Sequence, residues 1–169
     1  MDRVIELIKA AKGDAKQVFE SWGCNRSNFR YLSAPPQISV ADAQKYLERI
    51  MENPADPVFH IVTDRTVGLI KAKLDGHRAL VGYVIDEPFW GQGIATAALH
   101  QMVYLLRENS KIQRIWATCA TDNPGSSAVL EKCGFIREGI LRNWIVYPAQ
   151  GPEPQDNFSY YLPNNILAY

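Results

Sequence analysis

The chain has 169 residues, of which 47% are apolar and 21% are charged, the composition of an ordinary globular domain with a sizeable core. Lys and Arg together number 18, as do Asp and Glu, and this balance argues against nucleic-acid binding through counterion release and against a polybasic membrane surface. No apolar run reaches membrane-spanning length, and no signal-peptide hydrophobic region opens the chain. We therefore expect one domain over residues 1–169, with neither nucleic acid nor membrane as partner.

The cysteines Cys24, Cys119 and Cys133 are odd in number and widely spaced, and the histidines are only His60, His77 and His100. No Cys-x-x-Cys pair occurs among them. This pattern argues against a metal site and favours free thiols in a reducing compartment. We expect no metal and a cytoplasmic location.

The first fifty residues predict two helices separated by a loop. Residues 3–22 carry apolar side chains at helical spacing. Residues 23–36 contain Asn, Ser and a Pro-Pro pair, and are predicted as a loop. Its aromatic residues Phe29 and Tyr31 either line a substrate entrance or anchor the loop. A second helix is predicted over residues 40–52.

The period of the apolar side chains then changes to two. Three strands joined by short turns, and hence an antiparallel meander, are predicted at 58–63, 66–74 and 78–85. A helix at 93–109 and a strand at 112–119 follow.

The last part of the chain predicts a short helix and a closing pair of strands. Asn123 is a suitable N-cap for a helix over 124–133. Strands are predicted at 135–146 and 157–162, with the Pro- and Gly-rich segment 148–155 between them. The whole order predicts an α/β fold with a mixed, mostly antiparallel twisted sheet flanked by helices on both faces.

The glycine loop, residues 90–99, carries the clearest chemical signal: Trp-Gly-Gln-Gly-Ile-Ala-Thr-Ala-Ala-Leu. It lies between a predicted strand and a helix start, where free N–H groups and the positive end of the helix dipole favour an anion. Gly91 and Gly93 would let a phosphate approach the backbone. Two glycines alone are also consistent with a plain tight turn. A Gly-Lys-Ser/Thr motif is missing, and Thr96 replaces the third glycine of a dinucleotide fingerprint.

Two further stretches complete a pattern with this loop. Residues 123–135 read Asn-Pro-Gly-Ser-Ser-Ala-Val-Leu-Glu-Lys-Cys-Gly-Phe, and residues 137–142 read Arg-Glu-Gly-Ile-Leu-Arg, followed by Asp156 and Tyr160. Together these stretches resemble the GNAT superfamily of N-acetyltransferases, and within it the RimJ/RimL type, over roughly residues 36–162. The loop departs from the superfamily motif at its first position, Trp90. The resemblance implies a GNAT-like fold, with a shortened N-terminal edge because no first strand is evident before Asp14.

The resemblance also implies the reaction. It points to an enzyme that transfers an acetyl group from acetyl-CoA to a primary amine, either a protein N-terminus or a small molecule, by direct attack in a ternary complex. It implies coenzyme binding by the glycine loop and the preceding strand, at Val84, Ile85, Gly91, Gln92, Gly93, Ile94, Ala95 and Thr96. It also implies that Asn123 contacts the coenzyme arm where the strand 112–119 diverges from its neighbour. It leaves a homodimer open.

Ser126 is, by resemblance, the hydroxyl that lies near the coenzyme sulfur and protonates the leaving thiolate. Many superfamily members supply this proton from a tyrosine in the short helix, and the position that matches that tyrosine in this chain is Leu130. Alternatively, Ser126 only hydrogen-bonds the backbone of its own helix.

Candidate general bases for the protonated amine are Glu87, Asp86 and Glu138. Glu87 and Asp86 lie at the mouth of the expected cleft, and each carboxylate is also consistent with a solvated or capping role. His60, on a predicted strand, either faces the cleft or is structural. A catalytically inactive acyl-CoA-binding regulatory module is the alternative function, and a scaffold without ligand is disfavoured by the 123–135 motif.

Overall fold

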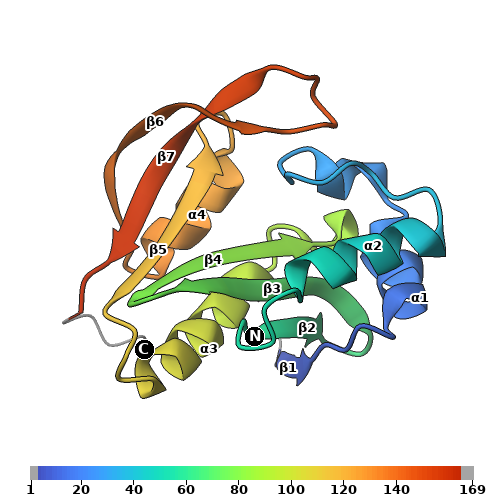
Figure 1. Ribbon diagram of the computed structural model, residues 1–169, viewed down its shortest axis with the longest axis horizontal. Coiled ribbons are helices and arrows are strands. Elements are labelled where there is room, and N and C mark those ends of the chain that lie inside the picture. The colour runs from blue at the N-terminus through green and yellow to red at the C-terminus, as the bar shows by residue number, and fades with distance from the viewer. Residues whose placement is uncertain (1–3, 165–169) are drawn as a thin grey trace.

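The fold is built on one twisted sheet of seven strands in the order β1-β2-β3-β4-β5-β7-β6, seen in a computed structural model that describes residues 4–164 (Figure 1). The strands are β1 Glu6–Lys9, β2 Val58–Val62, β3 Thr66–Asp75, β4 Arg78–Ile85, β5 Arg114–Ala120, β6 Ile136–Val146 and β7 Pro154–Leu162. The helices are α1 Ala15–Val18, α2 Val40–Ile50, α3 Ile94–Glu108 and α4 Pro124–Lys132, with shorter turns η1 Phe19–Gly23, η2 Arg26–Phe29 and η3 Glu87–Phe89.

The pairing of β4 with β5 is the feature of the sheet that positions the site. All other neighbouring strands pair antiparallel, whereas β4 and β5 run parallel. Their register covers Arg78–Leu80 of β4 against 114–116 of β5 and then ends. The two strands diverge beyond this point, so the predicted mixed, mostly antiparallel sheet opens in its middle (Figure 1).

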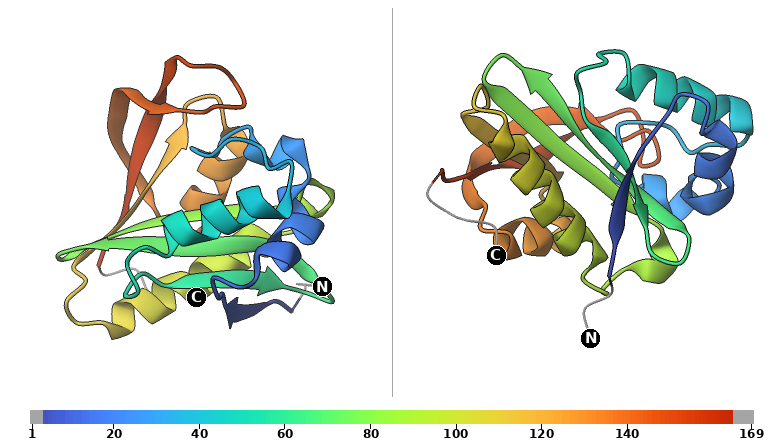
Figure 2. Two further views of the ribbon diagram at one scale, coloured as in Figure 1. Left: turned by 45° about the vertical axis from the view of Figure 1, so that its right-hand side comes forward. Right: turned by 90° about the horizontal axis from the view of Figure 1, so that it is seen from below.

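Helices cover both faces of the sheet, as predicted (Figure 2). On one face α3 buries Leu99, Met102, Val103 and Leu106 against the strands, because these residues recur at helical spacing. On the other face α1, η1 and α2 enclose a second apolar cluster that includes Trp22 and Leu47.

The predicted helix over residues 3–22 is wrong at its start. Position 3 lies outside the described residues, and residues 6–9 form β1, which pairs antiparallel with β2. The helical conformation begins only at Ala15 and continues into the π-helical η1. The largely apolar segment Val-Ile-Glu-Leu-Ile is too short to distinguish a helical period from a strand period. It forms a strand because it pairs with the otherwise free edge of β2. The first strand that the sequence did not make evident before Asp14 is therefore present, as the four residues of β1.

The closing hairpin also extends further than predicted. β7 begins at Pro154, which pairs with Val146 at the far end of β6. A proline fits at the first position of a strand because its missing N–H is not needed there. β6 accommodates the pairing by two register shifts, and Asn143 takes a positive φ of 48°. The Pro- and Gly-rich loop is therefore shorter than the predicted 148–155.

Candidate active site

A cavity of about 650 Å³ occupies the opening between β4 and β5. Its walls are residues 81–85 of β4 and 117–120 of β5, and the glycine loop and the first turn of α4 close one end. The other end is lined by the loop after η2 and by Ile145 and Tyr147 from the β6–β7 hairpin. Segments far apart in the sequence therefore meet around one space.

The glycine loop turns into α3 through two left-handed residues. Gly91 has a φ of 72° and Gly93 a φ of 76°, and Gly93 occupies the N-cap position of α3. The Trp90 indole N–H donates to the Ile85 carbonyl at 2.6 Å, which holds the loop against the end of β4. No side chain caps the helix, so the first N–H groups of α3 remain available to an anionic ligand in the cavity.

The structure brings the expected coenzyme residues together. This cavity is lined by Val84, Ile85, Gly91, Gln92, Gly93, Ile94, Ala95, Thr96 and Asn123, and also by Ser126. Residues from β4, the loop, α3 and the start of α4 thus share one surface.

Ser126 is held in place from two sides. The Asn123 side-chain oxygen accepts the Ser126 backbone N–H at 3.1 Å, which caps α4 as predicted. The Ser126 hydroxyl lies 2.9 Å from the hydroxyl of Tyr83 on β4. Burial raises the pKa of Tyr83, so its phenol stays protonated at neutral pH. Tyr83 was not predicted, because it lies within an apolar strand and only the tertiary fold brings it to α4.

Comparison with known proteins decides the family. Residues 5–136 match the family model described as an acetyltransferase (GNAT) domain. The chain belongs to the GNAT acetyltransferases. The resemblance drawn from the glycine loop and the 123–135 motif is confirmed.

Relatives of this GNAT acetyltransferase carry related names. The probable N-acetyltransferase YjcK of Bacillus subtilis is 30% identical over 137 residues, which cover 78% of this chain and 74% of the relative. The ribosomal-protein-serine acetyltransferase of Escherichia coli is 38% identical over 64 residues, covering 38% of this chain and 36% of the relative. The chain is an N-acetyltransferase by this kinship.

Solved structures show the same fold. RimL, a ribosomal L7/L12 alpha-N-protein acetyltransferase in complex with coenzyme A, superposes with a TM-score of 0.80 at 20% identity, over 93% of this chain and 92% of that chain. The spermidine N-acetyltransferase of Vibrio cholerae, in complex with CoA and spermine, gives 0.76 at 19% identity, over 94% of both chains. The predicted GNAT-like fold is confirmed.

The three candidate general bases of this GNAT acetyltransferase lie outside the cavity lining. Asp86 is buried and accepts hydrogen bonds from the side-chain amides of Asn28 at 2.9 Å and Asn25 at 3.1 Å, so it anchors the loop near η2. Glu87 is exposed, and its backbone N–H donates to the Asn28 side chain at 2.9 Å. Glu138 on β6 forms an ion pair with Arg114 of β5 and accepts a hydrogen bond from the Ser159 hydroxyl of β7. Among the described residues, no Asp, Glu or His side chain lines the cavity.

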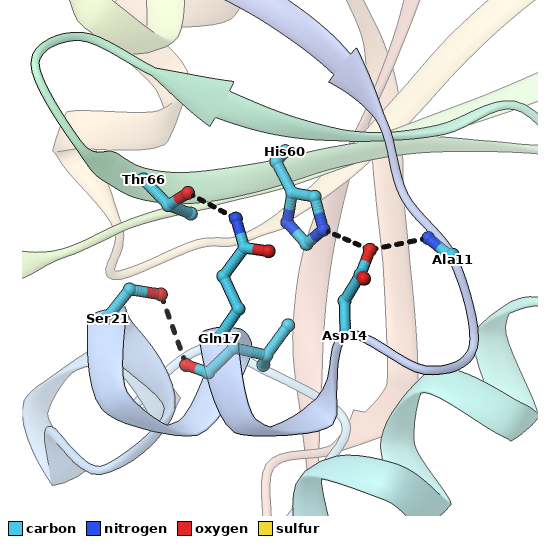
Figure 3. Close-up of polar contacts among 7 residues, drawn as sticks. Ala11, Asp14, Gln17, Ser21, His60 and Thr66 are labelled. Atoms are coloured by element: carbon cyan, nitrogen blue, oxygen red, sulfur yellow. Dashed lines mark hydrogen bonds and ion pairs between the residues drawn. The ribbon is translucent and has the colours of Figure 1, made fainter.

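His60 has a structural position in the GNAT acetyltransferase (Figure 3). It is buried on β2, and its Nε2 lies 2.9 Å from an Asp14 carboxylate oxygen that also accepts the Ala11 N–H at 2.7 Å. Next to it, the Gln17 amide donates to the Thr66 hydroxyl at 2.7 Å. These contacts tie the start of α1 to the sheet, and His60 does not line the cavity.

Phe29 and Tyr31 have different environments. Phe29 is completely buried and stacks on Trp22, which fits the anchoring role. Tyr31 lines the cavity, and its hydroxyl donates to the Asp122 carbonyl at 2.9 Å. Its ring meets the edge of Tyr147 from the β6–β7 hairpin, with ring centres 6.1 Å apart.

Across the described part of the chain, no helix combines the length and apolar content that a membrane span requires. The same residues contain no cluster of three or more His, Cys, Asp or Glu side chains that could hold a metal ion.

Proposed function

We propose that this GNAT acetyltransferase transfers the acetyl group of acetyl-CoA to an α-amino group, by direct attack of the amine in a ternary complex. The observation that carries the proposal is the cavity between β4 and β5, which joins an uncapped helix start to a half-buried pair of hydroxyls. Solved proteins of this fold include complexes with acetyl-CoA and with CoA.

The backbone around the cavity matches the parts of the coenzyme. The N–H groups of Gln92 to Thr96 would bind the pyrophosphate at the start of α3. The pantetheine amides would pair with the edge of β4 near Val84 and Ile85, where the register with β5 has ended. A main-chain N–H there would polarise the thioester carbonyl. Asn123 would contact the coenzyme arm on the opposite wall.

The lining of the acceptor end favours one class of amine. Lys132 is the one charged side chain among the described cavity residues, so no side chain there can remove a proton from an ammonium group directly. An α-amino group has a pKa of about 7.7–8.0 and a lysine-type amine about 10.4, so at pH 7 roughly a tenth of the former but less than a thousandth of the latter is neutral and able to attack. Glu87, exposed near the rim, would act as base through water.

The cellular setting is part of the proposal. Cys24, Cys119 and Cys133 are free thiols, which supports a reducing cytoplasm. A homodimer stays a prediction, which sedimentation velocity tests.

Titration calorimetry with acetyl-CoA, followed by a thiol-release assay, tests the function. The acceptor panel contains short peptides with a free or a blocked N-terminus, free lysine side chains in N-blocked peptides, and spermidine. We expect binding, and turnover only with free α-amines. Coenzyme binding without turnover of any amine would favour the inactive regulatory module, and preferred turnover of spermidine would overturn the proposed acceptor class.

A further inference from the structure

Tyr83 is a half-buried polar group in the cavity to which the proposed function gives no individual role. It lies on β4, and its hydroxyl is 2.9 Å from the hydroxyl of Ser126, 43 residues further along the chain. Both side chains line the cavity between β4 and β5. A tyrosine hydroxyl with this partner is placed to affect what the serine can do.

The donor in this contact follows from acidity. A phenol is ordinarily more acidic than an aliphatic alcohol and is therefore the stronger hydrogen-bond donor. The geometry allows either hydroxyl to donate, and the Tyr83 hydroxyl also lies 3.4 Å from the Ser126 carbonyl, so we assign Tyr83 as the donor to the Ser126 hydroxyl oxygen on this acidity. The Ser126 hydroxyl hydrogen is left for another acceptor.

The orientation of Ser126 would otherwise be free. A serine in the first turn of a helix commonly turns its hydroxyl to a backbone carbonyl of the same helix. The contact with Tyr83 holds the serine oxygen, and the cap from Asn123 at 3.1 Å holds the serine backbone. Leu130, buried later in the same helix, offers no hydroxyl to the cavity.

We propose that Tyr83 is a positioning residue that directs the Ser126 hydroxyl hydrogen at the sulfur of the coenzyme, an inference that rests on the proposed function. The amine nitrogen bonds to the thioester carbon, and the carbon–sulfur bond breaks with its electron pair on sulfur. The sulfur takes the Ser126 proton, Ser126 regains a proton from water, and the proton released by the amine passes to water. Tyr83 keeps its own proton and stabilises the negative charge that develops on the Ser126 oxygen.

A double-mutant cycle tests this role. Tyr83→Phe and Ser126→Ala should each lower kcat about tenfold, the effect of about one hydrogen bond of 1.4 kcal/mol. The dissociation constant for acetyl-CoA should stay within about twofold of the parent value, since a lost positioning contact affects the chemical step. The double variant should be no slower than Ser126→Ala alone, because Tyr83 acts only through the serine.

Tyr104→Phe is the matched control, because Tyr104 is exposed on the outside of α3 and should leave kcat unchanged. Circular dichroism checks each fold, and Tyr83→Leu replaces Tyr83→Phe should the latter not fold. Parent-like kcat in the Tyr83 variant, or losses that add in the double variant, would overturn the inference. A parent enzyme that fails to bind or turn over acetyl-CoA would instead overturn the proposed function.

Discussion

Gly93 shows how one residue sets the geometry of the candidate site. Its φ of 76° lies in the left-handed region, and a Cβ built there would meet no protein atom within 4 Å. An added side chain therefore strains the backbone by about 1–2 kcal/mol without a clash in the free protein. The open space beside Gly93 is the space in which the coenzyme phosphates would lie.

Gly93→Asp should nearly abolish acetyl-CoA binding, and Gly93→Ala should weaken it at least tenfold, since lost charge-assisted hydrogen bonds cost about 1.5–3 kcal/mol each. The carboxylate adds repulsion against the pyrophosphate. Titration calorimetry measures both affinities. Gly76→Ala, with a φ of 58° and equally open surroundings in the β3–β4 turn, is the control for backbone strain alone. Equal affinity for acetyl-CoA in the parent and in Gly93→Asp would show that the loop is only a tight turn and does not bind the coenzyme.

The Asp14–His60 pair should contribute a pH-dependent part of the stability. Burial raises the pKa of Asp14, but its hydrogen bonds with His60 and the Ala11 N–H outweigh burial and hold the pKa below the ordinary value. The stabilisation is therefore present above about pH 4 and is lost as pH falls through the folded-state pKa. Asp14→Asn should cost about 1–3 kcal/mol at pH 7.

Urea unfolding of the parent and Asp14→Asn at pH 7 and pH 3 measures this difference, which should shrink at the lower pH. The exposed pair of Asp75 and Arg78 provides the control, since Asp75→Asn should change stability by less than about 1 kcal/mol. An Asp14→Asn difference that is the same at both pH values would contradict the assignment.

Residues differ in how far the sequence reveals them. Gly91, Gly93 and Asn123 could be predicted because glycine turns and N-caps act through local backbone geometry. Tyr83 could not, because its partner is brought near only by the order of the strands. Asp86 looked like a base from its sequence position, but two amides from the loop near η2 enclose it.

Among the elements, the β6–β7 hairpin has the clearest link to specificity. Its loop reaches across the cavity, where the Gln150 amide donates to the Arg30 carbonyl at 2.6 Å. The rings of Tyr147 and Tyr31 also meet edge to face between these two segments. The hairpin and the loop near η2 thus border the acceptor end together, while the glycine loop closes the coenzyme end.

Deleting residues 149–151 should change acceptor preference and leave coenzyme affinity nearly intact. The loss of the Gln150 contact should raise KM for a peptide acceptor up to about tenfold, the value of one hydrogen bond. Steady-state kinetics and calorimetry on one preparation separate the two effects. A collapse of acetyl-CoA binding would show that the loop supports the coenzyme end instead.

Elements with a long repeating pattern were predicted well, and short ones were not. The apolar residues of α3 recur at helical spacing along the whole helix, and those of β2, β3 and β4 alternate along three strands. These repeats are long enough to distinguish helix from strand. The four residues of β1 were assigned to a helix, because only pairing with β2 decides their conformation. β7 was predicted too short, since its first residue is a proline.

At the scale of the whole molecule, the sheet has two parts, β1–β4 and β5–β7, that are joined only by the short parallel pairing of β4 with β5, which we call the seam. β4 and β5 share a register over three positions, whereas β3 and β4 share eight. Fold class followed from the order of elements, but the cavity at this seam could be expected only through the family resemblance, because divergence of two strands leaves no local sequence pattern.

Acetyl-CoA should raise the melting temperature markedly, because it would bind both parts of the sheet at the seam. At a ligand concentration of 100 times Kd the gain is about 2.7 kcal/mol, or roughly 5–10 °C for a chain of this size. Thermal unfolding followed by circular dichroism, with and without ligand, measures the shift. The Gly93→Asp variant should show almost none, and a similar shift in both proteins would contradict binding at the loop.

The seam also leaves main-chain amides of β4 beyond Leu80 without a strand partner on the β5 side. Buried amides without a partner exchange their hydrogen with solvent through small local openings. In deuterated water, amides of residues 81–85 facing β5 should therefore exchange faster than those shared by β2 and β3. Acetyl-CoA should slow them while leaving the β2–β3 pair unchanged, and hydrogen-exchange mass spectrometry would thus locate the coenzyme as a substitute strand inside the sheet.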